Sequence, residues 1–170
     1  MRLSLRKYLL LTSLIVAVQS SVLVAARAQV KIARSGTTVV SATSPKGKAQ
    51  VTIHTTIFDR SCVCSCPAAW ALKELNVKEI SVIEAFEISI AGKPLVVPDS
   101  VYDGLFDPHE ASLRFENGSF VLLINGLDAS NSYFVRIYFN REGVDRFMTY
   151  WAIVPDRPSS DTHYFPLVLK

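Results

Sequence analysis

After residue 28, hydrophobic and polar residues of the chain alternate with a period of two over several short stretches. Such alternation is typical of a β-strand with one face buried and the other in water. The segment 49–58 is the clearest case, with Val51, Ile53, Thr55 and Ile57 interleaved with Thr52, His54, Thr56 and Phe58.

Further runs rich in β-branched and aromatic residues are separated by Gly, Pro, Asn and Asp, and each predicts a strand. We expect the first two runs to form an opening pair around Gly36, and we expect Asn117 and Gly118 to form the type I′ turn of a hairpin, because both tolerate positive φ. The runs are 30–34, 37–42, 80–90, 95–97, 112–116, 119–124, 133–139, 147–154 and 163–169.

Two segments interrupt this pattern with helical signals. Residues 67–75 begin with Pro67, which suits a first helical turn, and continue with good helix formers. Asp99 or Ser100 can cap one further helical turn that ends near Phe106. The strand spacing of about 8–12 residues favours a sandwich over alternating strands and helices. We therefore predict a mainly β fold, a single antiparallel β-sandwich-like domain with one or two short helices.

Residues 1–28 have the pattern of a signal peptide. Arg2, Arg6 and Lys7 precede an apolar stretch, and Ala26-Arg27-Ala28 supplies small residues around a cleavage site. We expect export to the periplasm or the outside of the cell, with one domain at 29–170 and no membrane contact after cleavage. The alternative is an uncut segment that stays as a membrane anchor.

The expected cleavage changes the charge of the chain. The full chain has 18 basic and 15 acidic residues and a net charge of +3. Four basic residues lie in the leader and no acidic residue does, so the mature part has 14 basic and 15 acidic residues, a net charge of −1. A nucleic-acid partner is not expected, because the mature part has no basic run.

Three cysteines, Cys62, Cys64 and Cys66, lie within five residues. Thiolates are ligands for Cu(I) or Zn(II), so the cluster is a candidate metal site. A local or intermolecular disulfide and inert thiols are the other two interpretations. A periplasmic thiol or soft-metal protein that uses these cysteines is our alternative function.

The sequence has few signals of catalysis. His109 lies among acids in Asp107-Pro108-His109-Glu110 and could be a general base. Neither a Gly-x-Ser-x-Gly nor a His-Glu-x-x-His motif occurs. Asp99, Asp103 and Asp107 recur every four residues, which favours an acidic helix start over a calcium site. We predict no enzymatic activity and no cofactor.

Aromatic residues are concentrated after residue 132, where strand alternation would bury about half of them. The others could form a binding surface, since Tyr and Trp are enriched at interfaces. We therefore predict an exported, non-enzymatic β-sandwich module that binds a protein or carbohydrate-like partner, either through this aromatic face or through a sheet edge. The candidate contact residues are Tyr138, Tyr150, Trp151 and Tyr164.

Overall fold

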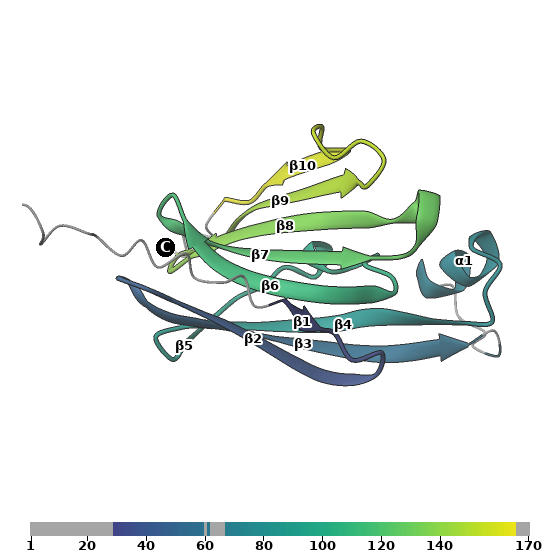
Figure 1. Ribbon diagram of the computed structural model, residues 1–170. Coiled ribbons are helices and arrows are strands. Elements are labelled where there is room, and N and C mark those ends of the chain that lie inside the picture. Colours follow the sequence, from purple (N-terminus) through teal and green to yellow (C-terminus); the bar gives the residue numbers. More distant parts are fainter. Residues whose placement is uncertain (1–28, 60, 62–66, 166–170) are drawn as a thin grey trace, which may run out of the picture.

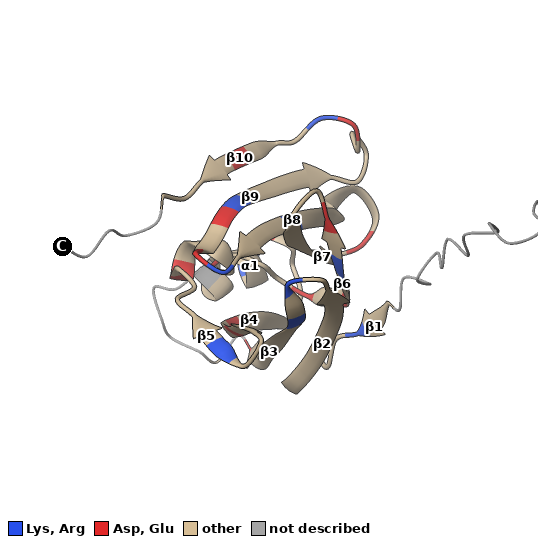
Figure 2. Ribbon diagram, turned by 90° about the vertical axis from the view of Figure 1, so that its left-hand side faces the viewer, with Lys and Arg blue, Asp and Glu red and all other residues tan. Residues whose placement is uncertain are grey.

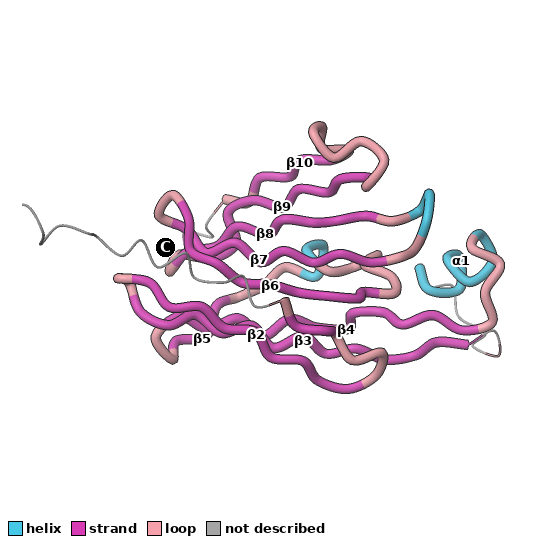
Figure 3. Tube along the Cα trace, viewed as in Figure 1, coloured by secondary structure: helices cyan, strands magenta, loops and turns pink. Residues whose placement is uncertain are grey.

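A computed structural model of the protein describes residues 29–59, 61 and 67–165. Two antiparallel sheets, of six and four strands, pack together with one short helix (Figure 1). This mainly β, sandwich-like architecture confirms the predicted fold class. In Figure 3 strands dominate the described chain and helix is confined to short pieces.

The six-stranded sheet has the order β1-β6-β7-β8-β9-β10 and the four-stranded sheet the order β2-β3-β4-β5. The strands of the first sheet are β1 (Val30–Lys31), β6 (Pro108–Glu116), β7 (Ser119–Gly126), β8 (Tyr133–Asn140), β9 (Gly143–Trp151) and β10 (Ser160–His163). Those of the second are β2 (Gly36–Ser44), β3 (Gly47–Asp59), β4 (Glu79–Ile90) and β5 (Lys93–Leu95).

Local sequence signals placed several elements correctly. The helix α1 (Pro67–Glu74) occupies the expected segment beside the ends of β3 and β4. Asn117 and Gly118 have φ of 49° and 89° and join β6 to β7, as a type I′ turn requires. A short 3₁₀ helix, η2 (Asp99–Val101), does follow Pro98, but the predicted cap was wrong: Pro98 occupies the N-cap position, no side chain caps the helix, and it ends at Val101 rather than near Phe106. A second 3₁₀ helix, η3 (Ala129–Asn131), precedes β8.

The expected opening pair of strands was wrong. β1 pairs with β6 and β2 with β3, so the chain passes from one sheet to the other between them. Side chains of the four-stranded sheet hold this crossing: the Thr55 hydroxyl donates to the Ala33 carbonyl at 2.7 Å and the Ser81 hydroxyl to the Arg34 carbonyl at 2.6 Å. Local alternation could not reveal this, because the partner of β1 lies about eighty residues away.

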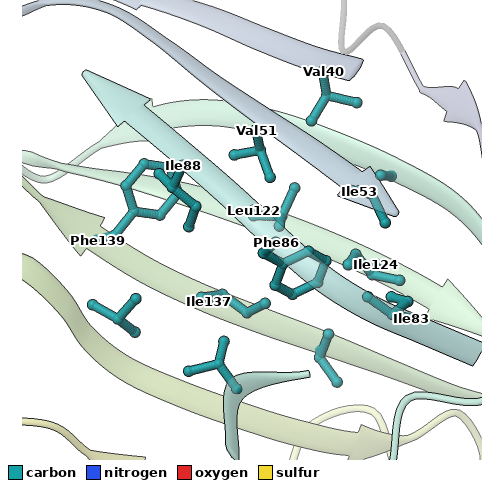
Figure 4. Packing of buried hydrophobic residues seen from close by; sticks show 14 of the residues in the cluster. Val40, Val51, Ile53, Ile83, Phe86, Ile88, Leu122, Ile124, Ile137 and Phe139 are labelled. Atoms are coloured by element: carbon teal, nitrogen blue, oxygen red, sulfur yellow. The ribbon is translucent and has the colours of Figure 1, made fainter. Parts of the chain in front are cut away.

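The main hydrophobic core lies between the two sheets (Figure 4). Residues of one parity on each strand enter it, as strand alternation requires. From the six-stranded sheet come Phe120, Leu122, Ile124, Val135, Ile137 and Phe139, and from the other Val40, Val51, Ile53, Phe86 and Ile88.

A bulge divides β4 into two halves that bury opposite parities. The register with β3 shifts between His54 and Thr55, which leaves Glu84 as an extra residue in β4. Ile83 therefore shares the main core with Phe86, whereas Ile80 and Val82 lie on the other face and pack with α1 in a second cluster. Unbroken alternation along the predicted run 80–90 would instead place Ile80 and Val82 on the same face as Ile88.

The last strand also differs from its prediction. β10 occupies Ser160–His163 rather than 163–169, and residues 166–170 lie outside the described part. Its register with β9 places Asp161 beside Met148 and His163 beside Arg146. The side chains of β10 are polar, so hydrophobicity did not mark it.

Candidate functional site

The side of the six-stranded sheet that faces away from the core is the candidate site, and we refer to it as the outer face. On β8 the core takes every second residue from Tyr133 to Phe139, so the residues between them face outward. The outer face includes Glu110, Ser112 and Arg114 on β6, Val121, Leu123 and Asn125 on β7, Phe134, Arg136 and Tyr138 on β8, Arg146, Met148 and Tyr150 on β9, and Asp161 and His163 on β10.

Two aromatic rings and a guanidinium group form the centre of the outer face. The Phe134 and Tyr150 rings stack, with centroids 4.5 Å apart and planes inclined by 8°. The Arg136 guanidinium lies 5.1 Å from the Tyr150 centroid and 5.8 Å from that of Phe134. Cation–π attraction of this kind is worth about 0.5–1 kcal/mol at an exposed site. The two rings therefore favour this position of the guanidinium on the outer face of the sheet.

Other arginines on the outer face have carboxylate partners. Arg146 forms a bidentate pair with Asp161 at 2.7 and 2.5 Å, and this cation lowers the pKa of Asp161. Arg114 Nε lies 2.8 Å from a Glu116 carboxylate oxygen. By contrast, in the described part of the chain no carboxylate lies within 4.0 Å of an Arg136 nitrogen. Among the described residues Arg136 is thus a cation without a carboxylate partner.

A shallow depression of about 190 Å³ adjoins the Phe134 ring. Its wall carries hydrogen-bonding groups of several kinds: the Asn125 amide donates to Glu110 at 3.4 Å, and Ser112 and Arg114 lie on the neighbouring strand. The depression therefore combines one aromatic ring with amide, carboxylate, hydroxyl and guanidinium groups.

The four aromatic residues predicted from the sequence do not lie on one surface. Tyr138 and Tyr150 are both on the outer face, but Tyr150 is only 5% exposed because its neighbours cover it. Trp151 is exposed, but it follows Tyr150 directly in β9 and therefore does not belong to the outer face; its partner across the ladder is Tyr133. Tyr164 packs against the main core, and its hydroxyl lies 3.0 Å from that of Ser100.

Sequence reasoning missed Phe134 and Arg136 as members of the site. The signal was present in β8, where Tyr133, Val135, Ile137 and Phe139 mark the buried parity and leave the residues between them outside. The sequence analysis selected Tyr and Trp by residue type alone and did not use the alternation along β8 to decide which residues face outward.

The cysteine cluster Cys62, Cys64 and Cys66 lies outside the described residues. Within the described part, no group of three or more His, Cys, Asp or Glu side chains is arranged to hold a metal ion. Asp99, Asp103 and Asp107 thus form no such group. Asp99 instead accepts a hydrogen bond from Tyr102 at 2.6 Å, and this contact raises the pKa of the Tyr102 phenol.

His109 lies between two carboxylates at the start of β6. Its Nε2 is 3.5 Å from Asp107 and its Nδ1 is 3.9 Å from Asp128. Among residues 29–59, 61 and 67–165, no hydroxyl is hydrogen-bonded to the His109 ring. In that part of the chain the ring therefore has no hydroxyl that it could activate as a nucleophile.

His54 has a threonine on one side and a carboxylate on the other. Its Nδ1 is 3.4 Å from the Thr37 hydroxyl and its Nε2 is 3.2 Å from Glu87. A hydroxyl, an imidazole and a carboxylate follow one another in this order in a hydrolytic triad. Here the three residues are cross-strand neighbours on β2, β3 and β4, and 73% of the Glu87 side chain is exposed, whereas the carboxylate of a triad is buried. Cross-strand polar contacts of this kind support sheet pairing.

No family model matches the chain, and neither a curated protein nor a solved structure matches it. A helix long and apolar enough to cross a membrane is not found among the described residues.

Proposed function

We propose that the protein is an exported, non-enzymatic β-sandwich module that binds an acidic saccharide chain on the outer face. The observation that carries this proposal is Arg136, a guanidinium fixed by the Phe134 and Tyr150 rings with no carboxylate partner in the described structure. A planar guanidinium suits bidentate recognition of a carboxylate. The carboxylate of a uronic acid would supply the negatively charged partner that Arg136 lacks among the described residues.

The surroundings of Arg136 support a saccharide as the carrier of that carboxylate. Sugar rings present hydroxyl groups at their edges and C–H groups on their faces. The depression beside Phe134 offers Asn125, Glu110 and Arg114 for the hydroxyls and an aromatic ring for the C–H face. The strands β6 to β9 hold these groups side by side, so an extended chain can contact them in turn. Rigid sheet strands keep the contacts in register without a cost in loop ordering.

The test compares oligomers of a hexuronic acid with neutral hexose oligomers of the same length, titrated calorimetrically into the purified protein. We expect binding of the acidic oligomer that weakens with added salt. Arg136→Gln should lower its affinity about tenfold or more, because a hydrogen bond to a charged group contributes about 1.5–3 kcal/mol. Arg136→Lys should restore only part of it, because an ammonium cannot form the planar fork.

Arg157→Gln is the matched control, since Arg157 is an exposed arginine of the loop between β9 and β10. It removes the same charge from a side chain that does not lie over the Phe134 or Tyr150 ring, and it should leave the affinity unchanged. Equal losses in the Arg136 and Arg157 variants would reduce the effect to net charge. Absence of binding to every acidic oligomer would refute the proposal.

A further inference from the structure

Two cavities adjoin each other at one end of the sandwich, where β5 and the turn between β8 and β9 both contribute residues. The larger cavity has a volume of about 530 Å³ and the smaller one of about 240 Å³, and Leu95 and Arg141 line both. Figure 2 views the sandwich from this end and shows a basic position on β5. None of the described residues that line the two cavities belongs to the outer face. Together the cavities have the volume of a small-molecule site.

The larger cavity borders the main hydrophobic core. Leu95, Val144 and Tyr164 line it, and all three also belong to that core or pack against it. Two further apolar side chains of its lining are open to water, since Val96 is 82% exposed and Phe165 is 88% exposed. An apolar chain in this cavity would extend the core and cover these two side chains, and such burial is favourable.

The smaller cavity has two cations in its lining. Among the described residues, Lys93 and Arg141 line it together with the apolar Ile90, Ala91 and Leu95, and no acidic residue does. Within the same part of the chain, no carboxylate oxygen lies within 4.0 Å of a side-chain nitrogen of Lys93 or Arg141. The charge of this cavity therefore suits an anionic group.

The Arg141 side chain reaches from one sheet to the other. Its residue lies in the turn between β8 and β9, and its Nη2 donates to the Lys46 carbonyl in the turn between β2 and β3, at 2.6 Å. This is the one hydrogen bond of the guanidinium in the described structure, so its other nitrogens can donate to a ligand. A guanidinium binds a carboxylate through two parallel hydrogen bonds.

We propose that the two cavities together bind a fatty acid, whose apolar chain occupies the larger cavity and whose carboxylate lies between Lys93 and Arg141 in the smaller one. The negative headgroup complements the two cations, and the chain covers Val96 and Phe165. Leu95 lines both cavities, so the chain and the headgroup meet beside it. This site is separate from the proposed saccharide site and does not depend on it.

Two carboxyl groups, Glu142 and Asp145, also line the larger cavity. The Asn140 amide donates to both carboxyl oxygens of Asp145, each at 3.0 Å, so this group is bonded within the chain. Glu142 is exposed, and its negative charge opposes a bound carboxylate. Replacement of Glu142 by a neutral residue should therefore leave fatty-acid binding intact or strengthen it.

Calorimetric titration of decanoate, octanoate and decan-1-ol into the purified exported form tests the proposal. Decanoate should bind about tenfold more tightly than octanoate, because it buries two more methylene groups. Decan-1-ol has the same chain length without the charge and should bind about tenfold or more weakly than decanoate. Arg141→Gln and Lys93→Gln should each weaken the binding of decanoate and leave that of decan-1-ol unchanged. Both residues are exposed, and melting curves should show that the variants fold.

Two matched pairs of variants provide the controls. Glu142→Gln changes the residue next to Arg141 in the same turn and should not weaken decanoate binding. Val96→Ser should weaken both decanoate and decan-1-ol, whereas Val39→Ser, at an exposed valine of β2, should weaken neither. No binding of decanoate, equal affinities for decanoate and decan-1-ol, or equal losses in the Arg141 and Glu142 variants would each overturn the proposal. Equal losses in the two valine variants would also overturn it, because the ligand would then adsorb to apolar surface in general.

Discussion

Gly126, at the end of β7, is the position where one added methyl group should cost the most. A Cβ there would lie 2.5 Å from the Tyr133 hydroxyl oxygen and 2.8 Å from the Asp107 carbonyl oxygen, well inside van der Waals contact. Tyr133 is 6% exposed, and its hydroxyl donates to the Phe106 carbonyl at 3.0 Å. Neither the buried ring nor the backbone oxygen can withdraw without disturbing this bond.

The expected cost of Gly126→Ala follows from three contributions. Overpacking of a filled interior costs about 1–3 kcal/mol. Loss of the Tyr133 hydrogen bond costs about 1 kcal/mol more. Alanine would otherwise stabilise a strand by about 0.5–1 kcal/mol over glycine. The free energy of unfolding should therefore fall by about 2 kcal/mol, measured by urea denaturation.

A double-mutant cycle with Tyr133→Phe identifies the contact responsible. In the wild-type background that substitution should cost about 1 kcal/mol, because the partly buried Phe106 carbonyl loses its donor. In the Gly126→Ala background it should cost much less, because it removes the atom closest to the new methyl group. Costs that add within about 0.5 kcal/mol, or a neutral Gly126→Ala, would refute this reasoning.

The remaining predictions concern a turn, a carboxyl group, the leader segment 1–28 and the cysteine cluster. Gly118→Val should destabilise by about 1 kcal/mol or more in urea denaturation, because a β-branched residue resists a φ of 89°. Burial raises the pKa of Asp145, so the stability it contributes at low pH is lost as the pH rises through its folded pKa. Asp145→Asn should therefore gain stability relative to wild type as the pH rises above about 4, whatever the constant offset from its altered hydrogen bonds. The intact mass of the exported form should correspond to a chain that begins at Gln29; a mass that includes residues 1–28 in a membrane fraction would instead indicate an uncut anchor. One thiol per chain should react with a maleimide under oxidising conditions, because three cysteines cannot all pair within the chain; three reactive thiols without bound metal would exclude both a disulfide and a metal site.

The elements that the sequence predicted correctly are those specified by neighbouring residues. The Asn117–Gly118 turn depends on the φ preferences of two adjacent residues, and β3 depends on alternation over ten. Both signals are local, so no knowledge of the rest of the fold was needed.

The errors arose where a distant partner determines the structure. β1 has only two residues and pairs with β6, about eighty residues later, so the residues next to β1 in the sequence do not indicate its partner. β10 is polar and is held by β9 through contacts such as Arg146 with Asp161. The site shows the same limit. Arg136 became a candidate only when the structure placed it beside two stacked rings and away from the carboxylates of the described residues.

The bulge at Glu84 allows β4 to carry one residue more than its partner strand requires. Thr55 pairs with Ile83 and His54 with Ala85, so deletion of Glu84 would bring Ile83 directly next to Ala85 and would leave both pairings unchanged. Ile80 and Val82 would then still face α1. With Glu84 absent, removal of a second residue before Phe86 would exchange the faces of the residues that precede it. Related sequences that keep this fold should therefore tolerate the loss of position 84 but not the loss of one further residue between Ile80 and Phe86.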